Sequence, residues 1–156
     1  MIDTTVKVAD KLVGEYDIIP NPWIKEFYNE NQELVSVEFH EITAIRFGEF
    51  AGCTNLALTS LPAGVTSIGA SAFQGCTNLA LTSLPAGLTS IGEYAFGGCT
   101  SLTSITFKGT PTTINSAAFN GCTNLTEIKV PWSEGAVANA PWGATNATIT
   151  YNYVGE

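Results

Sequence analysis

Four evenly spaced cysteines and one histidine are the residues of this sequence that could carry reactive chemistry. A thiol beside His40 could act as a nucleophile with an imidazole base. Cysteines in close pairs bind zinc, and cysteines brought together by stacking can reach disulfide distance. The cysteines recur at one constant interval, at Cys53, Cys76, Cys99 and Cys122.

The constant spacing favours none of these reactive sites. Zinc sites use short spacings such as Cys-x-x-Cys, and a single histidine excludes a site with two. A disulfide needs suitable side-chain geometry as well as proximity. We therefore predict free, buried cysteines that behave as small hydrophobic residues. The sequence also lacks a glycine-rich phosphate loop and a Gly-x-Ser-x-Gly motif, so we expect no catalytic residue, metal or cofactor.

Many other residues recur at the same interval as the cysteines. The segments 51–73 and 74–96 differ at only four of their 23 positions. One turn of such a repeat cannot enclose its own apolar side chains, so successive turns stack and each set of equivalent residues becomes part of a continuous core. The other recurring positions are Phe50, Phe73, Phe96 and Phe119; Leu56, Leu79, Leu102 and Leu125; Ile68, Ile91 and Ile114; and Ala72, Ala95 and Ala118.

Each repeat is expected to consist mainly of short strands and turns. Alternation over 102–107 predicts one strand, and 65–68 predicts a second extended piece after the turn at 62–64. The segment 70–75 predicts a short helical turn closed by Gly75. The predicted fold is a right-handed solenoid of stacked coils of short β-strands and turns, with little helix and a cap at each end.

The repeat resembles the BspA-type leucine-rich repeats. The shared pattern is Cys-Thr-x-Leu-Thr-x-Ile-x-[Phe/Val], followed by x-Ile-x-x-x-Ala-Phe-x-Gly-Cys, over about residues 42–131. This family occurs in bacterial surface proteins and in some parasite surface proteins, and is associated with adhesion and protein binding. The resemblance therefore implies a leucine-rich-repeat solenoid with a binding role at a cell surface or outside the cell.

The first two repeats depart from this pattern. Where later repeats have Ile105 and Ile128, the first two have threonine, and the preceding leucines fall at positions that are polar later on. A one-residue slip swaps the faces of a strand, so Leu58 and Leu81 could point inward. We favour this slip, because exposed leucines are unfavourable unless a partner covers them. The alternative places Leu58 and Leu81 in a binding patch.

Both ends of the solenoid need to be covered. We divide the sequence into an N-terminal cap (1–41), the repeats (42–131) and a C-terminal cap (132–156). In the first cap, Asn21 and Pro22 predict the start of a helix, one face of which (Trp23, Ile24, Phe27, Tyr28) seals the first coil. An exposed aromatic binding face is the alternative. In the second cap, 147–153 predicts a final strand. Trp132 and Trp142 are expected to close this end, with sugar binding as the alternative.

Charge and hydropathy narrow the possible partners. The formal net charge is −8, with ten of the fourteen acidic residues before position 50. No cluster of basic residues could neutralise a phosphate backbone, so nucleic acid is a poor candidate. No apolar run reaches the ~20 residues of a membrane span, and no signal peptide is visible, so a cytoplasmic location stays open beside the cell surface.

The leading functional hypothesis is a non-catalytic module that binds a protein, such as a host or matrix protein, or a glycan. The candidate binding face is hydroxyl-rich and includes Thr103 and Thr106, with Leu58 and Leu81 if they are exposed. Ladders of threonine such as Thr66, Thr89 and Thr112 usually reflect β-preference and cross-strand bonding, although a flat array could bind ice or polysaccharide. The main alternative is a structural spacer or terminal domain of a larger surface or phage-tail assembly. The sequence favours no particular oligomeric state, and an enzyme ranks third among the functional classes.

Overall fold

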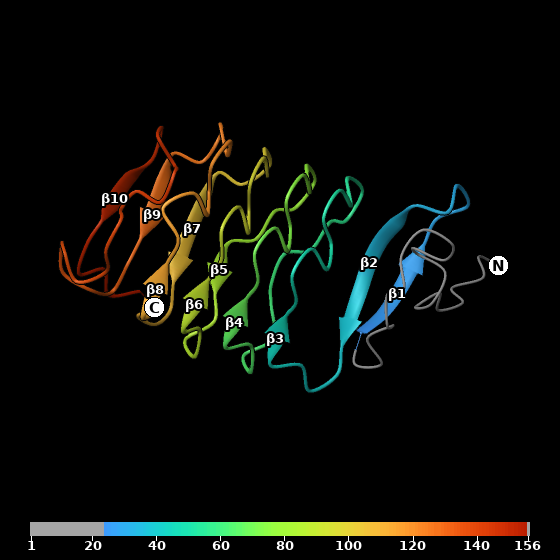
Figure 1. The fold of residues 1–156 in the computed structure, drawn as a ribbon, viewed down its shortest axis with the longest axis horizontal. Helices are drawn as coiled ribbons and strands as arrows, with labels where there is room; N and C mark the ends of the chain where they lie inside the picture. Colours follow the sequence, from blue (N-terminus) through green and yellow to red (C-terminus); the bar gives the residue numbers. More distant parts are fainter. Residues whose placement is uncertain (1–23, 156) are drawn as a thin grey trace.

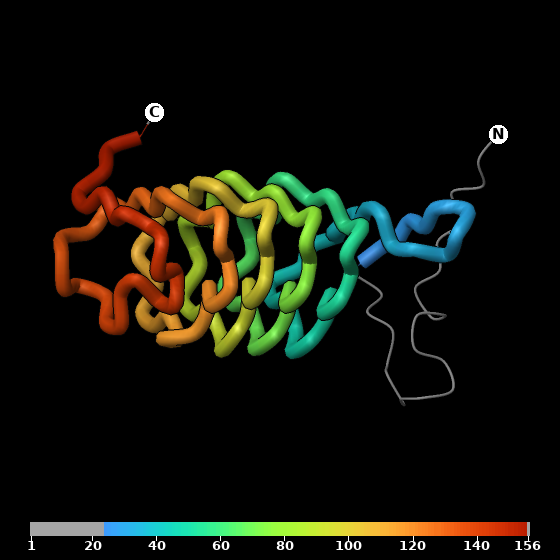
Figure 2. Tube along the Cα trace, turned by 90° about the horizontal axis from the view of Figure 1, so that it is seen from above, coloured from blue at the N-terminus to red at the C-terminus, as the bar shows by residue number. Residues whose placement is uncertain are grey.

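The computed structural model describes residues 24–155, which form a row of stacked coils with a hairpin at the N-terminal end. Figure 1 shows the short strands of successive coils lying side by side along the long axis. Figure 2 shows the same coils from above, with the two ends of the described segment at opposite ends of the row. The predicted solenoid of short strands and turns is confirmed, and within residues 24–155 there is no helix.

Two parallel sheets run along the solenoid. The first, called here the β4 sheet, contains β3 (Ala44–Ile45), β4 (Ser67–Ile68), β6 (Ser90–Ile91) and β8 (Thr113–Ile114) in that order. The second, called the β7 sheet, has the order β10 (Thr148–Thr150), β9 (Glu127–Lys129), β7 (Ser104–Phe107) and β5 (Ser83–Leu84). Strand pairing joins equivalent residues of successive repeats, such as Ile68 with Ile91 and Ile105 with Ile128, so the sequence interval is the strand register.

The core between the sheets is built from ladders of equivalent residues. The phenylalanine rings from Phe50 to Phe119 stack with centroid separations of 5.3, 5.5 and 5.1 Å, and all four are fully buried. Each buried ring removes a large apolar surface from water and so contributes strongly to the stability of its coil. The stacked phenylalanine spine predicted from the spacing is therefore present.

The predicted helical turn at 70–75 is a series of tight turns in the structure. The amides of Ala72 and Gln74 each donate to the carbonyl of the third residue before them, while Ser71 has a positive φ of 57°. That conformation interrupts a helix, because L-residues adopt it only as single positions. Gly75 has a φ of 78°, as expected for a glycine that closes such a turn.

The helix predicted in the N-terminal cap is wrong over the residues that the structure describes. The segment is β1 (Ile24–Tyr28), which pairs antiparallel with β2 (Leu34–Phe39). Alternate burial of Ile24 and Glu26 around exposed Lys25 has the period of a strand, and aromatic and β-branched residues favour strands. Asn21, Pro22 and Trp23 lie outside the described residues.

The hairpin still covers the first coil, although by different means. The ring of Phe39 on β2 packs edge-on against Phe50 at a centroid distance of 6.2 Å. The amide of Ala57 donates to the carbonyl of Val35, which joins β2 to the first coil. A strand hairpin thus performs the sealing role that the sequence assigned to a helix.

The segment 132–150 forms a further coil, which the sequence indicated only as a cap. Phe119 donates its amide to the carbonyl of Trp142, and β10 pairs parallel with β9. The amide group of the Asn146 side chain donates to the carbonyl of Thr123, as that of Asn124 does to the carbonyl of Thr100. The repeating pattern of hydrogen bonds therefore continues beyond the last recognisable repeat. The predicted final strand is present as β10.

Candidate binding face

The outer face of the β7 sheet carries two rows of polar side chains. Inward positions such as Ile105 and Ile128 are buried, and the alternate positions point outward. Parallel register places paired residues on the same side of the sheet, so each row crosses several coils. One row is Ser83, Thr106, Lys129 and Thr150, and the other is Ser104, Glu127 and Thr148.

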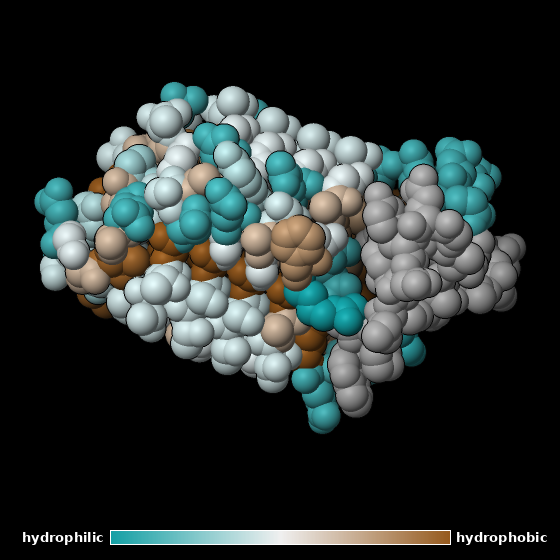
Figure 3. Space-filling view, viewed as in Figure 1, coloured by the Kyte–Doolittle hydropathy of each residue, from teal (hydrophilic) through white to brown (hydrophobic). Residues whose placement is uncertain are grey.

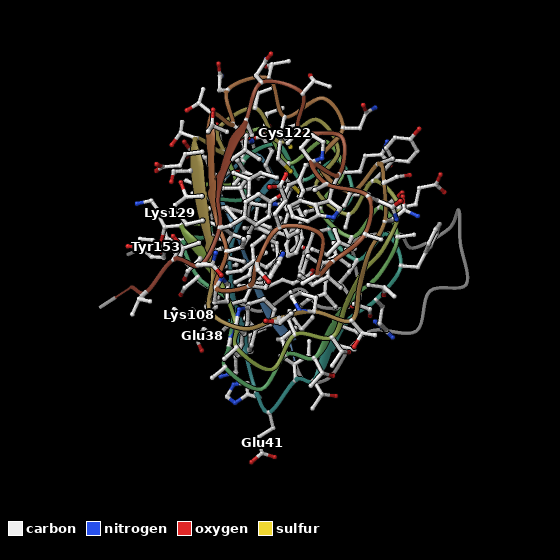
Figure 4. The ribbon with its side chains drawn as sticks, turned by 90° about the vertical axis from the view of Figure 1, so that its left-hand side faces the viewer. Glu38, Glu41, Lys108, Cys122, Lys129 and Tyr153 are labelled. Atoms are coloured by element: carbon white, nitrogen blue, oxygen red, sulfur yellow. The ribbon has the colours of Figure 1, made fainter. Side chains whose placement is uncertain are left out.

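Three residues of these rows and Tyr153, which follows β10, form a charged cluster called here the Lys129 cluster (Ser104, Glu127, Lys129 and Tyr153). The Lys129 ammonium lies 3.5 Å from a Glu127 carboxylate oxygen and 5.0 Å from the centroid of the Tyr153 ring. The Ser104 hydroxyl donates to the same Glu127 oxygen at 3.2 Å. Viewed along the axis from the C-terminal end, Lys129 and Tyr153 lie together on one outer side of the coil (Figure 4).

The Lys129 cluster contributes little to stability but offers varied recognition chemistry. Exposed ion pairs are typically worth about 0–1 kcal/mol, because water already solvates both charges. The same groups present an ammonium, a carboxylate, a hydroxyl and an aromatic ring within one small area. Such a mixture can recognise hydrogen-bonding and apolar groups of a partner together.

The four residues proposed from the sequence occupy different environments. Thr103 is exposed just before β7, and Thr106 is half-buried on the outer face of β7 itself. Leu81 is only 1% exposed, so the inward slip is confirmed there and Leu81 is not part of a surface patch. Leu58 is half-buried against the core. The structure therefore places Thr103 and Thr106 near one another and leaves the leucines in or against the interior.

The outer face of the β4 sheet is chemically simpler. It presents Ser67, Ser90 and Thr113 beside the threonine ladder. The hydroxyls of Thr66 and Thr89 donate to the carbonyls of Thr43 and Thr66 in the preceding coil, at 3.1 and 2.9 Å. These hydroxyls therefore link coils, as the structural interpretation of the ladder requires. Figure 3 shows one side of the molecule as mostly polar, with a narrow apolar stripe along the long axis.

The four cysteines form no disulfide, and three of them lie in the interior. Cys76, Cys99 and Cys122 are buried, and each thiol donates to a phenylalanine carbonyl of the preceding coil at 2.9–3.1 Å. Burial is the main cause that raises the pKa of the Cys99 thiol far above its usual value, and the neighbouring cysteines Cys122 and Cys76 add to it. Burial also raises the pKa of Cys122 to about 11. The prediction of buried cysteines without disulfides is confirmed for these three, whereas Cys53 is half-buried.

We expect an order of thiol reactivity that follows this burial. Native protein treated with iodoacetamide should be alkylated first at Cys53, and urea-unfolded protein at all four cysteines, because only an accessible thiolate reacts. Peptide mass spectrometry measures the order. Equal native labelling of Cys53 and Cys99 would contradict the buried ladder.

The raised thiol pKa values also predict alkaline destabilisation. Cys122 in the folded protein binds its proton more tightly than in the unfolded protein, so its contribution is complete below pH 9.0 and declines as pH rises toward about 11. Urea unfolding midpoints measured across this window should fall with pH. A Cys122→Ala variant should show a smaller decline.

The two C-terminal tryptophans are buried rather than displayed. Trp142 is fully buried and Trp132 is 6% exposed, with ring centroids 6.1 Å apart. Phe107 packs against both rings, at 5.2 Å from Trp132 and 6.1 Å from Trp142. This packing closes the end of the core, as expected, and contradicts the alternative of an exposed sugar-binding pair.

Sequence reasoning missed two features of this end of the molecule. The additional coil has a faint signal, because the run Gly-Ala-Thr-Asn-Ala from Gly143 parallels Gly-Cys-Thr-Asn-Leu from Gly121, with an interval one position shorter than that of the repeats. The contact of Tyr153 with Lys129 has no sequence signal, because it depends on the backbone path after β10.

His40 is exposed, and among residues 24–155 no group of three or more His, Cys, Asp or Glu could hold a metal ion. None of the described residues forms a helix that could cross a membrane.

Comparison with known proteins gives one family match and two similar solved structures. A model described as the BspA type leucine-rich repeat region, in six copies, matches residues 24–139. A leucine-rich repeat protein from T. pallidum is 20% identical, with 86% of this chain and 82% of that one covered and a TM-score of 0.42. One from Bacteroides ovatus is also 20% identical, with 73% and 47% covered and a TM-score of 0.33. No curated protein sequence matches this one.

Proposed function

This chain belongs to the BspA-type leucine-rich repeat family, and from that premise we propose that it is a non-catalytic binding module that contacts a protein partner through the outer face of the β7 sheet. The proposed contact surface comprises the Lys129 cluster with Thr103 and Thr106. We further propose that the protein works at a cell surface or outside the cell, where the partner is a host or matrix protein. A glycan partner is the second ligand class to test.

The Lys129 cluster is the observation that carries this proposal. Residues 50–130 contain only two acidic and two basic side chains. One of each, Glu127 and Lys129, stands on the outer face of the same strand, β9. The core ladders would be unchanged without these charges, so the solenoid does not need them for folding. Charges on an otherwise neutral surface direct the orientation and selectivity of a partner more than they add affinity.

Substitution of Thr106 tests the face directly. Thr106→Arg adds bulk and positive charge beside Lys129, and should weaken binding by about 30-fold or more, the factor expected for a hot-spot residue. The matched control is Thr113→Arg on β8, which makes the same change on the outer face of the β4 sheet. Binding of both variants is measured by biolayer interferometry against the matrix proteins and glycans that the unmodified protein binds on purified arrays.

The comparison of the two variants decides which face is used. Loss of binding in Thr106→Arg with retention in Thr113→Arg supports the β7 sheet, provided that both variants keep the unfolding midpoint of the parent. The reverse pattern assigns binding to the β4 sheet. Absence of any ligand on both arrays would contradict the binding role. Protease treatment of intact source cells tests the location, because only an exposed protein releases peptides before lysis.

A structural spacer is the second candidate function, favoured by the near-identity of segments 51–73 and 74–96. Repeats that serve only to add length need no surface variation, and a structural component is expected to associate with itself. Analytical ultracentrifugation over a range of concentrations distinguishes the two. Concentration-dependent oligomers without ligand binding would favour the spacer, and a monomer that binds an array ligand would favour the binding module.

A further inference from the structure

The turn after Phe119, the last phenylalanine of the stacked ladder, contains Asn120-Gly121, the only Asn-Gly pair in the sequence. Both residues are exposed, and Gly121 has a positive φ of 79°. At the position of Asn120 the three earlier repeats have Ala51, Gln74 and Gly97. The turn is therefore shared by all four repeats, whereas an asparagine side chain next to the glycine occurs only in this one.

The backbone N–H of the glycine is also bonded differently in this turn. In the earlier repeats it donates to a carbonyl of the following coil: Gly52 to Gln74 at 2.7 Å, Gly75 to Gly97 at 2.8 Å and Gly98 to Asn120 at 2.9 Å. The N–H of Gly121 has no acceptor within residues 24–155. The cause is the altered final coil, in which Phe119 donates to Trp142, one position further along than the acceptors of the earlier phenylalanines.

We propose that Asn120 is a site of spontaneous deamidation in the folded protein. The deprotonated backbone nitrogen of Gly121 attacks the carbonyl carbon of the Asn120 amide group and forms a new C–N bond. The bond from that carbon to the side-chain nitrogen Nδ2 of Asn120 breaks, and this nitrogen leaves as ammonia. Water then opens the resulting succinimide at one of its two carbonyls. The products are aspartate and isoaspartate at position 120, each with one additional negative charge, and the sequence involves no oxidation or reduction.

The unbonded N–H is what makes this turn susceptible. A glycine nitrogen that donates to a neighbouring coil must break that hydrogen bond before it can attack, which lowers the rate by the cost of the bond. Gly121 makes no such bond to a described residue, and its missing side chain leaves the nitrogen open to approach. The two requirements, a free nitrogen and an adjacent asparagine, coincide at this position.

Isoaspartate at position 120 would disturb the attachment of the last coil. A Cβ on Gly143 would lie 2.9 Å from the backbone nitrogen of Asn120 and 3.1 Å from its Cα, so the two backbones are already in close contact. The carbonyl of Asn120 also accepts the bond from Gly98. Isoaspartate inserts one methylene group into the main chain at this contact, which shifts atoms that have no room to move.

The test incubates the folded protein in mildly alkaline buffer at physiological temperature and follows isoaspartate in the peptide containing residue 120 by mass spectrometry. Three proteins are compared: the parent, Asn120→Gln, and Asn120→Gln combined with Gln74→Asn. The last moves the Asn-Gly pair to a turn whose glycine N–H is bonded to Gly97. We expect conversion at position 120 in the parent and none there in Asn120→Gln. The combined variant should react roughly five- to tenfold more slowly, the factor for breaking one backbone hydrogen bond.

Two results would overturn the proposal. The first is that Asn120 stays unmodified in the folded parent while the same incubation produces isoaspartate in an unfolded sample of the parent. The folded turn would then protect the site. The second is an equal rate at the relocated pair in the combined variant, because the unbonded glycine nitrogen would then not be the determinant. Unfolding midpoints measured beforehand ensure that all three proteins are folded during incubation.

Discussion

Replacement of Phe96 by alanine should destabilise the protein by about 3–5 kcal/mol, the range for truncating a fully buried aromatic residue. The Phe96 ring is inaccessible to solvent and stacks on both sides, against Phe73 at 5.5 Å and Phe119 at 5.1 Å. Removing it interrupts the ladder in a central coil and leaves a cavity that rigid neighbouring coils cannot fill. Urea unfolding followed by circular dichroism measures the change.

Phe47→Ala is the matched control, because it deletes the same side chain from the surface. Phe47 is 78% exposed, so its loss should change the free energy of unfolding by no more than about 0.5 kcal/mol. If Phe96→Ala cost less than about 1 kcal/mol, the stacked spine would not be the main source of stability in the repeats. A large effect of Phe47→Ala would instead reveal a contact made by this side chain beyond those described.

Truncation of Trp142 to alanine should have an effect of similar size, about 3–5 kcal/mol, at the end of the core. Trp142 is fully buried, packs against Phe107 and Trp132, and donates its indole N–H to the carbonyl of Ala138 at 2.8 Å. Its loss removes both the ring that closes the core and the bond that shapes the final coil. Urea unfolding measures the total cost, and limited proteolysis within 132–150 reports the local loosening.

Trp132→Phe provides the comparison for this prediction. The indole nitrogen of Trp132 is buried without a hydrogen-bond partner among residues 24–155. Phenylalanine keeps most of the apolar packing and removes a polar group that is costly to bury, so the net change should be under about 1 kcal/mol. A greater loss for Trp132→Phe than for Trp142→Ala would show that Trp132 is the residue that holds the end closed.

The repeated core could be predicted from the sequence because it depends only on periodicity. Once identical coils stack, equivalent residues must meet, so the spacing of Phe73 and Phe96 determines both the strand register and the stacked rings. The same argument identified the buried cysteines Cys76, Cys99 and Cys122. These features do not depend on the detailed path of any one turn.

The structures of the two ends of the solenoid do not depend on the repeat, and the sequence predicted them less well. The segment from Ile24 to Tyr28 has aromatic spacing compatible with a helix face, but its pairing with Leu34–Phe39 makes it a strand. That choice depends on a partner strand that satisfies backbone groups, and local propensity does not report it. The additional coil at 132–150 was hidden because a shortened interval and altered core residues weaken the repeat.

The candidate site combines both kinds of information. Thr106 could be placed on an outer strand face from alternation alone, whereas the contact of Lys129 with Tyr153 arises only from the backbone path after β10. A group of side chains that joins different coils depends on several turns at once. Its members therefore cannot be deduced from the spacing of a single repeat.

One pair of identical segments shows directly what the sequence determines and what the tertiary structure determines. Residues 57–64 and 80–87 have the same sequence, Ala-Leu-Thr-Ser-Leu-Pro-Ala-Gly, yet the second contains β5 and buries Leu81, while the first forms no strand and leaves Leu58 half-buried. The sequence alone determined that both segments occupy equivalent positions in successive coils of a leucine-rich solenoid. Tertiary structure decided which becomes a strand, because 80–87 lies beside β7 and 57–64 lies beside the terminal hairpin. A strand forms only where a neighbour accepts and donates its backbone hydrogen bonds.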